Sequence, residues 1–258
     1  MLKYVIAILA IANFASAEIK TEKVTYKDGK AELEGFVAYD DSKTGPLPAV
    51  IIVHDWMGPG EYTEMRAKQL AELGYYAFAA DIYGKDLRPK NGEEASKAAG
   101  DFRNGDRKLL RSRAKAAFDF VTKQKQVQKK KVSAMGYCFG GTVALEMGRA
   151  GIPLKGILSF HGGLSNTNPK DAKNLNKSKV LVMHGAVDPY VSAEEFTTFK
   201  KELDESKADY QIIMYSGAVH AFTQKHVGTD VKSGAAYNEA ADRRSFEDMK
   251  DFLIEVNL

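Results

Sequence analysis

The 258-residue chain contains a single cysteine, which excludes an internal disulfide framework and any cysteine-rich metal site. Prolines number only seven, and no proline-rich or glycine-rich stretch marks a linker between domains. The 37 basic and 34 acidic residues nearly cancel, so the net charge of +3 gives no reason to expect nucleic acid as a partner. A hydrophobic content of 44% excludes wholesale disorder. The solitary cysteine is therefore the feature to explain.

The longest apolar run lies at the N-terminus and is too short to span a membrane. Lys3 precedes an apolar stretch from Tyr4 to Ala12, and Ala15-Ser16-Ala17 follows. A basic start, a short apolar core and an A-x-A end are typical of a secretory signal peptide, whereas a membrane anchor needs about 20 apolar residues. We expect residues 1–17 to be a signal peptide, and the mature protein to be periplasmic or extracellular, with no membrane span.

The pattern beyond residue 17 predicts an α/β protein. Strand patterns at Ile19–Tyr26 and Ala31–Tyr39 flank Asp28-Gly29, a strong hairpin signal. Apolar runs typical of parallel strands then alternate with helical patterns. The expected strands are Ala49–Val53, Tyr76–Ala80, Val132–Met135, Gly156–Phe160, Val180–Met183 and Gln211–Tyr215, and the expected helices are Glu61–Leu73, Arg107–Thr122, Thr142–Arg149, Ala193–Glu205 and Tyr237–Val256. We predict one domain over residues 18–258, with helices on both faces of a mostly parallel sheet.

Cys138 lies between an expected strand and an expected helix, in the segment Gly136-Tyr137-Cys138-Phe139-Gly140-Gly141. This is the G-x-nucleophile-x-G pattern of the α/β-hydrolases, with cysteine where serine is usual. Such a nucleophile occupies a strained turn, and the N-terminus of the following helix favours the thiolate. The Phe139 N–H would be one oxyanion-hole donor. The alternative is an inert buried cysteine beside a glycine-rich turn.

A cysteine nucleophile needs a base, and the base needs an acid that orients it. The chain order in α/β-hydrolases is nucleophile, acid, histidine. Asp188 and His220 each follow an expected parallel strand, so both lie at the sheet edge where doubly wound folds place their sites. Singly, Asp188 has a plainer interpretation as a cap or turn residue, and His220 as a loop histidine. Their order and common edge favour a triad of Cys138, His220 and Asp188.

Other histidines suggest a metal site as a weaker alternative. His54, His161 and His184 also follow apolar runs, and three such rings could hold a metal ion. The sequence has no H-x-x-H or H-E-x-x-H spacing, and it lacks the glycine motifs of nucleotide-binding sites. We expect neither a metal nor a cofactor.

These motifs resemble the dienelactone hydrolase family, cysteine hydrolases of the α/β-hydrolase superfamily. The similarity runs from about Ile19 to the C-terminus. Its most specific segments are Val53-His54-Asp55-Trp56-Met57-Gly58, Asp81-Ile82-Tyr83-Gly84, Met135-Gly136-Tyr137-Cys138-Phe139-Gly140-Gly141, His184-Gly185 to Asp188, and Gly217-Ala218-Val219-His220-Ala221-Phe222. The resemblance implies an α/β-hydrolase fold with an N-terminal antiparallel hairpin. It also implies Cys138 as nucleophile, His220 as base and Asp188 as the partner of the base.

The resemblance adds residues that the motif alone does not assign. Family members carry a carboxylate that contacts the thiol, and Asp55 stands at that position, where the best-known members have glutamate. Trp56 would supply the second oxyanion-hole N–H. Members also bind a substrate carboxylate through arginines, but Gln224 replaces one of them, and the stretch Gly92–Gly100 contains no arginine at the other. Because bidentate carboxylate recognition favours arginine, we expect neutral substrates to be preferred.

We therefore predict that a monomeric protein hydrolyses a small-molecule ester or lactone through a thioester on Cys138. Two alternatives from other classes remain. One is a binding protein that keeps the fold without the chemistry. The other is a thiol redox protein, although the chain has no second cysteine for a reversible internal disulfide.

Overall fold

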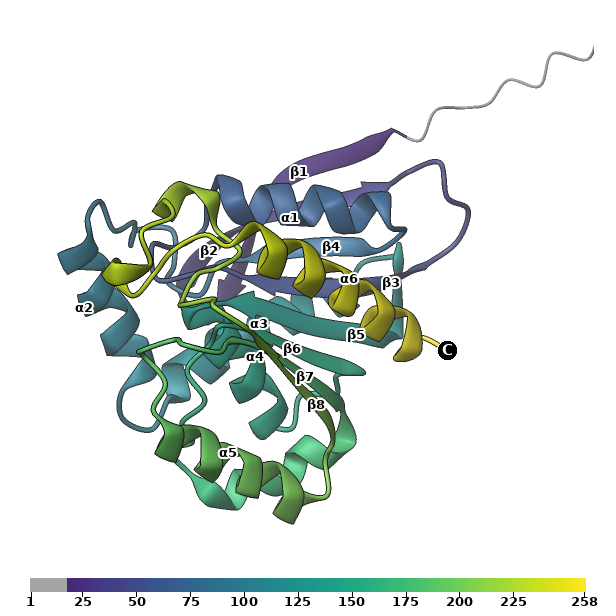
Figure 1. Ribbon diagram of the computed structural model, residues 1–258. Coiled ribbons are helices and arrows are strands. Elements are labelled where there is room, and N and C mark those ends of the chain that lie inside the picture. Colours follow the sequence, from purple (N-terminus) through teal and green to yellow (C-terminus); the bar gives the residue numbers. More distant parts are fainter. Residues whose placement is uncertain (1–17) are drawn as a thin grey trace, which may run out of the picture.

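The computed structural model describes residues 18–258, so the expected signal peptide lies outside the described residues. These residues form one eight-stranded sheet in the order β1-β2-β4-β3-β5-β6-β7-β8 (Figure 1). The strands are β1 (Ile19–Asp28), β2 (Ala31–Asp40), β3 (Leu47–Val53), β4 (Tyr76–Ala80), β5 (Val127–Tyr137), β6 (Gly156–Phe160), β7 (Lys179–Gly185) and β8 (Asp209–Tyr215). Strands β3 to β8 run parallel to one another, whereas β2 runs antiparallel to both β1 and β4.

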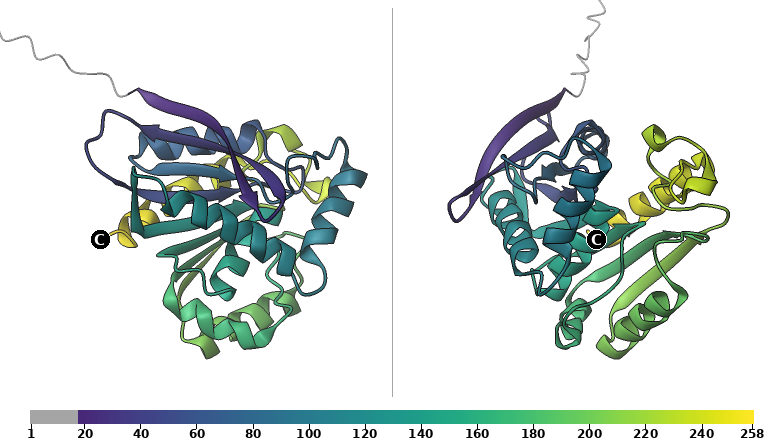
Figure 2. Two further views of the ribbon diagram at one scale, coloured as in Figure 1. Left: turned by 180° about the vertical axis from the view of Figure 1, so that it is seen from behind. Right: turned by 90° about the vertical axis from the view of Figure 1, so that its left-hand side faces the viewer.

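Helices cover both faces of the sheet (Figure 2). The helices are α1 (Glu61–Glu72), α2 (Gly92–Arg103), α3 (Lys108–Thr122), α4 (Phe139–Arg149), α5 (Ala193–Ser206) and α6 (Glu239–Glu255), with short 3-10 turns at Pro169–Lys177, Lys225–Val227 and Val231–Ser233. Apolar residues of α1 and α6 belong to the core on one face, and those of α2 to α5 belong to the core on the other. The predicted fold class, an α/β-hydrolase fold with an antiparallel N-terminal hairpin, is confirmed.

Strand β3 illustrates why an unbroken apolar run forms a central parallel strand. Ala49, Ile51 and Val53 face the core that includes α3 and α4, whereas Val50 and Ile52 face the core that includes α1 and α6. All five side chains are buried, so both faces of the strand exclude water. A strand in a sheet that is covered by helices on both sides needs apolar side chains on both of its faces, and β3 has them.

The antiparallel hairpin forms where its turn signal predicts it. Asp28 pairs with Ala31 across the turn, and Gly29 adopts a φ of 59° there. Two-residue hairpin turns need such left-handed backbone, which glycine adopts without a steric penalty.

Helix α2 is the main element that the sequence pattern does not predict. Its start does carry a cap, because the Asn91 side chain accepts a hydrogen bond from the backbone N–H of Glu94 at 3.0 Å. Its buried face consists of three alanines and Phe102, a weak apolar signal. Strand β5 also begins at Val127, five residues before the expected start.

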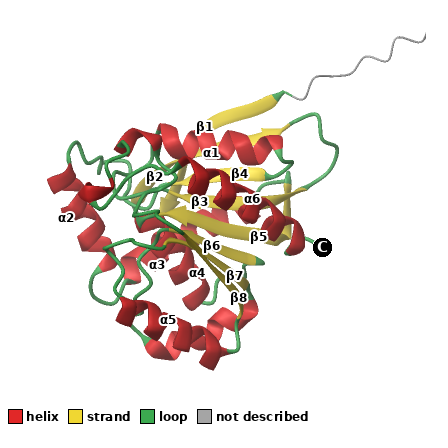
Figure 3. Ribbon diagram, viewed as in Figure 1, coloured by secondary structure: helices red, strands yellow, loops and turns green. Residues whose placement is uncertain are grey.

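The loops that follow the parallel strands gather at their carboxyl ends, near α2 (Figure 3). Doubly wound sheets place their sites at this edge.

No helix within residues 18–258 combines the length and the apolar character that a membrane crossing requires.

Candidate active site

Cys138 occupies a strained turn between β5 and α4. Its φ of 54° and ψ of −114° lie outside the regions that side chains other than glycine favour. The backbone N–H of Cys138 donates to the carbonyl oxygen of Phe160 at 3.0 Å. The side chain therefore stands at the N-terminus of α4, where the helix dipole favours negative charge.

Two flanking glycines leave room for this turn. A Cβ atom on Gly136 would lie 2.0 Å from the carbonyl oxygen of Gly140, and a Cβ on Gly140 would lie 2.3 Å from the carbonyl oxygen of Val53. Neither contact is tolerable between backbone and side-chain atoms. Glycine at both positions is thus what allows β3, β5 and α4 to approach closely around the cysteine.

A buried charge cluster anchors α4 behind the cysteine. The carboxylate of Glu146 accepts hydrogen bonds from Arg107 at 2.9 Å, Arg111 at 2.8 Å and Arg149 at 3.0 Å. Burial alone would raise the pKa of Glu146, but the three arginines lower it below its ordinary value. Arg149 also pairs with Glu202 of α5, so the cluster ties α3, α4 and α5 together.

The structure brings the expected base and acid together. Nδ1 of His220 lies 2.9 Å from Oδ2 of Asp188. The other oxygen of the buried Asp188 carboxylate accepts the Tyr190 N–H at 2.8 Å, which fixes the orientation of the carboxylate. His220 therefore has the orienting partner that a catalytic histidine needs.

His220 is poised to carry a positive charge. Burial opposes protonation of the ring, but the hydrogen bond to Asp188 and the proximity of Asp188 and Cys138 outweigh it, raising the pKa of His220 to about 10. A protonated imidazole next to the sulfur is the partner that stabilises a thiolate.

The two expected oxyanion donors flank the cysteine. Phe139 is the first residue of α4, and Trp56 follows β3. Within the described part of the chain, neither backbone N–H donates a hydrogen bond to a protein group. The Tyr83 hydroxyl donates to the carbonyl oxygen of Trp56 at 2.9 Å and so holds this peptide in place.

Asp55 and Gln224 contact each other. Nε2 of Gln224 donates to Oδ2 of Asp55 at 2.6 Å, and the N–H of Met57 donates to Oδ1 at 2.8 Å. No hydrogen bond joins Asp55 directly to the Cys138 sulfur among residues 18–258, so the role of Asp55 toward the thiol stays a prediction. Asp55 instead shapes the loop that carries Trp56.

A pocket of about 380 Å³ opens beside Cys138 and His220. Trp56, Gln224 and Tyr190 line it, together with Arg103 from the end of α2. Arg103 lies three residues beyond Gly100, on helix α2. The sequence pattern predicts neither this helix nor a positive charge in the pocket. Arg103 forms no ion pair with any residue of the described chain.

The remaining histidines occupy separate positions. His54 contacts the Asp55 carbonyl oxygen through Nδ1 at 2.6 Å and the Ile82 N–H through Nε2 at 3.1 Å. Nε2 of His184 lies 3.7 Å from Oδ2 of Asp188, beyond hydrogen-bond distance. The described residues contain no cluster of three or more histidine, cysteine or carboxylate side chains arranged to hold a metal ion.

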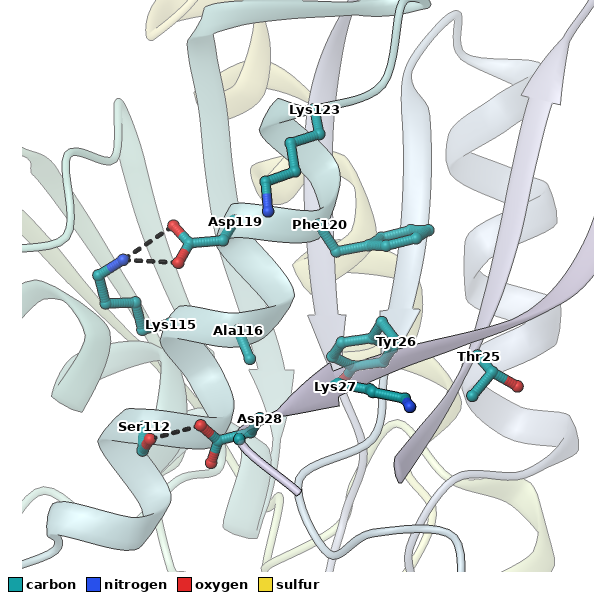
Figure 4. Close-up of a pocket in the computed structure, with 11 residues that line it drawn as sticks. Thr25, Tyr26, Lys27, Asp28, Ser112, Lys115, Ala116, Asp119, Phe120 and Lys123 are labelled. Carbon is teal, nitrogen blue, oxygen red and sulfur yellow. Dashed lines mark hydrogen bonds and ion pairs between the residues drawn. The ribbon is translucent and has the colours of Figure 1, made fainter. Parts of the chain in front are cut away.

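A second hollow of about 470 Å³ lies between β1 and α3 (Figure 4). Its lining residues pair with one another: Lys115 forms an ion pair with Asp119, and the Ser112 hydroxyl donates a hydrogen bond to Asp28. No loop at the carboxyl ends of the parallel strands contributes to it. Of these two hollows, only the pocket beside Cys138 is lined by Cys138 and His220.

The mostly parallel sheet, with a strained turn after a central strand, defines an α/β-hydrolase. The chain belongs to the dienelactone hydrolase family, whose sequence profile matches residues 33–257. The protein is thus an enzyme that hydrolyses small carboxylic esters or lactones.

Three relatives illustrate the similarity. A dienelactone hydrolase-like promiscuous phosphotriesterase from metagenomic libraries, P91, has a TM-score of 0.88 and 37% sequence identity, and the match covers 93% of this chain and 99% of that chain. A Yersinia pestis protein named as a carboxymethylenebutenolidase is 28% identical over 200 residues, 74% of each chain. A Bradyrhizobium protein named as a 2-oxo-3-(5-oxofuran-2-ylidene)propanoate lactonase is 28% identical over 188 residues, 69% of this chain and 75% of the relative.

Proposed function

We propose that the enzyme cleaves its ester or lactone through a covalent thioester on Cys138. The observation that carries this proposal is the strained Cys138 turn next to the hydrogen-bonded pair of His220 and Asp188. The Cys138 sulfur attacks the carbonyl carbon, and the carbonyl π electrons move to the oxygen. The N–H groups of Phe139 and Trp56 stabilise the resulting oxyanion.

Collapse of this intermediate breaks the bond between the carbonyl carbon and the alkoxide oxygen. The protonated His220 gives its Nε2 proton to the departing alkoxide, which leaves a thioester on Cys138. Neutral His220 then removes a proton from water, and the hydroxide attacks the thioester carbon. The acid departs, and the thiolate and imidazolium pair is restored. Asp188 keeps the ring oriented throughout.

The pocket favours substrates with no more than one negative charge. Gln224 is an uncharged amide already engaged by Asp55, so it offers no guanidinium to a carboxylate. Arg103 is the single arginine among the residues that line the pocket. We therefore infer that neutral esters are hydrolysed well and that an anionic group is tolerated only toward Arg103.

The test is the Cys138→Ala variant with chromogenic aryl esters. We expect turnover to be abolished and the wild type to release a burst of one aryl alcohol per enzyme as the thioester forms. Near wild-type turnover by the variant would exclude Cys138 as nucleophile. A wild-type enzyme with no turnover and no alkylation of Cys138 by iodoacetamide below pH 8 would favour a binding protein.

We propose phosphotriester hydrolysis as a side activity. The observation in favour is the 37% identity to P91, whose name describes a promiscuous phosphotriesterase. The same N–H donors would polarise a P=O bond as they polarise C=O. Release of aryl alcohol from a neutral aryl dialkyl phosphate by the wild type, and none by Cys138→Ala, would support it. Equal release by both would reject it.

We also propose that the enzyme is exported after cleavage behind Ala17, as the N-terminal pattern indicates. Mass spectrometry of the secreted or periplasmic product should give a chain that starts at Glu18. A product that retains Met1 inside the cell would contradict this.

A further inference from the structure

We propose that His161 is a positioning residue for the nucleophile, an inference that rests on the proposed role of Cys138. His161 directly follows β6 and is completely buried. Its Nδ1 accepts a hydrogen bond from the backbone N–H of Cys138 at 3.1 Å. The same N–H also bonds to Phe160, so two acceptors hold the strained peptide from one side.

The hydrogen-bond pattern defines the protonation of the His161 ring. Because Nδ1 faces the N–H of Cys138, Nδ1 carries no proton and the neutral ring has its proton on Nε2. Nε2 lies 3.0 Å from Oγ1 of Thr223, which therefore accepts this proton. A protonated ring would place a second N–H against that of Cys138.

The surroundings keep His161 uncharged. Burial, then the nearby His220 and His184 rings and Arg66, lower the pKa of His161 well below its ordinary value. Its ring meets the ring of His220 edge to face, with centroids 5.1 Å apart. A neutral His161 is therefore compatible with a charged His220, whereas a second imidazolium at this distance would repel it.

A chain of hydrogen bonds anchors His161 to α1 and α6. The Tyr62 hydroxyl donates to Oγ1 of Thr223 at 2.8 Å, and Nε of Arg66 donates to Tyr62 at 3.2 Å. Arg66 in turn pairs with Asp242. Each donor in this series points toward Thr223 or toward the next oxygen of the series. The His161 ring therefore has a single orientation in which both of its nitrogens are hydrogen-bonded. The helices on one face of the sheet thus support the peptide that holds the nucleophile.

The role of this contact is geometric. Cys138 has to present its sulfur to the substrate carbonyl within a small angular range, and misplacement of a reacting group by about 1 Å costs up to about 100-fold in rate. His161 restrains the backbone of the cysteine and packs on the base, so it touches both partners, yet it is not among the residues that line the pocket.

The test compares His161→Asn with His161→Gln in the full-length enzyme. The Asn carbonyl can replace Nδ1 as the acceptor of the Cys138 N–H, and asparagine tolerates the φ of 40° at this position. The longer Gln side chain reaches Thr223 instead. We expect His161→Asn to keep kcat within about threefold of wild type, and His161→Gln to lose about 10-fold in kcat with little change in KM.

A second measurement separates this inference from the proposed hydrolysis. The rate of Cys138 alkylation by iodoacetamide, recorded against pH, reports on the thiol without any ester turnover. We expect the alkylation profile of His161→Asn to match wild type and that of His161→Gln to be about 10-fold lower, at similar thermal midpoints. Failure of ester turnover in the wild type would leave this contrast intact.

Equal values for both amide variants, in kcat and in alkylation, would overturn the proposal. If His161→Gln does not fold, the Thr223→Val variant tests the proposal instead. It removes the Oγ1 acceptor of the His161 Nε2 proton and keeps the shape of the side chain. We expect this variant to lose about threefold to fivefold in kcat and in alkylation rate, the equivalent of about one net hydrogen bond. Unchanged values in Thr223→Val would also overturn the proposal.

Discussion

The side-chain amide of Gln224 donates a 2.6 Å hydrogen bond to the carboxylate of Asp55, although 169 residues separate them in the sequence. Both side chains are buried. At both positions the chain departs from the pattern that the resemblance to the dienelactone hydrolases implies, with an aspartate for a glutamate and a glutamine for an arginine. The two departures form one contact, in which a neutral amide is the hydrogen-bond partner of the carboxylate.

Removal of the Gln224 amide should destabilise the protein. Gln224→Leu leaves one oxygen of the buried Asp55 carboxylate without its donor, and we expect the free energy of unfolding to fall by about 1–3 kcal/mol. Urea unfolding at pH 7 measures this. Gln211→Leu on the exposed face of β8 is the control, and an equal loss in the two variants would contradict the role of the contact.

The charge on His220 should make stability depend on pH in a defined direction. The pKa of His220 is about 10 in the folded enzyme, against an ordinary value of 6.5 in the unfolded chain. The stabilisation from the charged ring is therefore complete below about pH 6.5 and is lost as the pH rises toward 10. Unfolding of wild type and His220→Gln across this range should show the steeper loss in the wild type. Parallel curves would disprove the raised pKa.

The cysteine should contribute to that pKa. The neighbouring Cys138 side chain raises the pKa of His220, so Cys138→Ala should shift the ring titration to lower pH. NMR titration of the His220 ring measures the shift directly. An identical titration in the variant would mean that Asp188 alone sets the pKa.

Asp188→Asn should cost far more activity than a change at the neighbouring His184. The amide cannot hold the same tautomer of His220, and we expect kcat to fall by about 10³-fold to 10⁴-fold. His184→Gln is the matched control, because its ring lies 3.7 Å from Asp188 and forms no hydrogen bond to it. We expect a loss below about threefold there, because no hydrogen bond between the two side chains is lost. Steady-state kinetics on one aryl ester compares the two variants.

The triad candidates could be predicted because their positions depend on local patterns. Cys138 is marked by flanking glycines, and Asp188 and His220 each follow an apolar strand. Parallel strands end at one edge of the sheet, so residue order along the chain translates directly into proximity. The 2.9 Å contact between His220 and Asp188 agrees with that reasoning.

The remaining features depend on tertiary contacts that no local pattern encodes. Arg103 enters the pocket on α2, whose alanine-rich face gives a weak hydrophobic signal. The pairing of Asp55 with Gln224 joins two distant loops. The acceptor role of His161 depends on the turn of another strand, at Cys138. A histidine at a strand end looks the same in sequence whether it binds a metal or a backbone N–H.

Gly140→Ala should disrupt the turn, whereas Gly92→Ala should not. A Cβ on Gly140 would stand 2.3 Å from the Val53 carbonyl oxygen, so β3 and α4 would have to separate. A Cβ on Gly92 would meet Trp56 at 3.5 Å, an ordinary contact in the first turn of α2. We expect a loss of about 1–3 kcal/mol in stability for Gly140→Ala, together with the loss of ester turnover. Thermal unfolding and kinetics of both variants test this, and an active Gly140→Ala enzyme would contradict the close packing.

Arg103→Gln should lower activity toward anionic esters more than toward neutral ones. Arg103 is exposed at the pocket and has no ion pair in the described chain, so its charge is available to a substrate anion. At low salt we expect kcat/KM for a carboxylate-bearing aryl ester to fall about threefold to fivefold, with little change for its neutral analogue. The difference should shrink at high salt, because ions screen an exposed charge. Lys97→Gln is the control, since Lys97 lies on the same helix but pairs with Asp101 at 2.8 Å and is absent from the pocket lining. Equal losses for both esters in Arg103→Gln would show that this arginine does not select substrate charge.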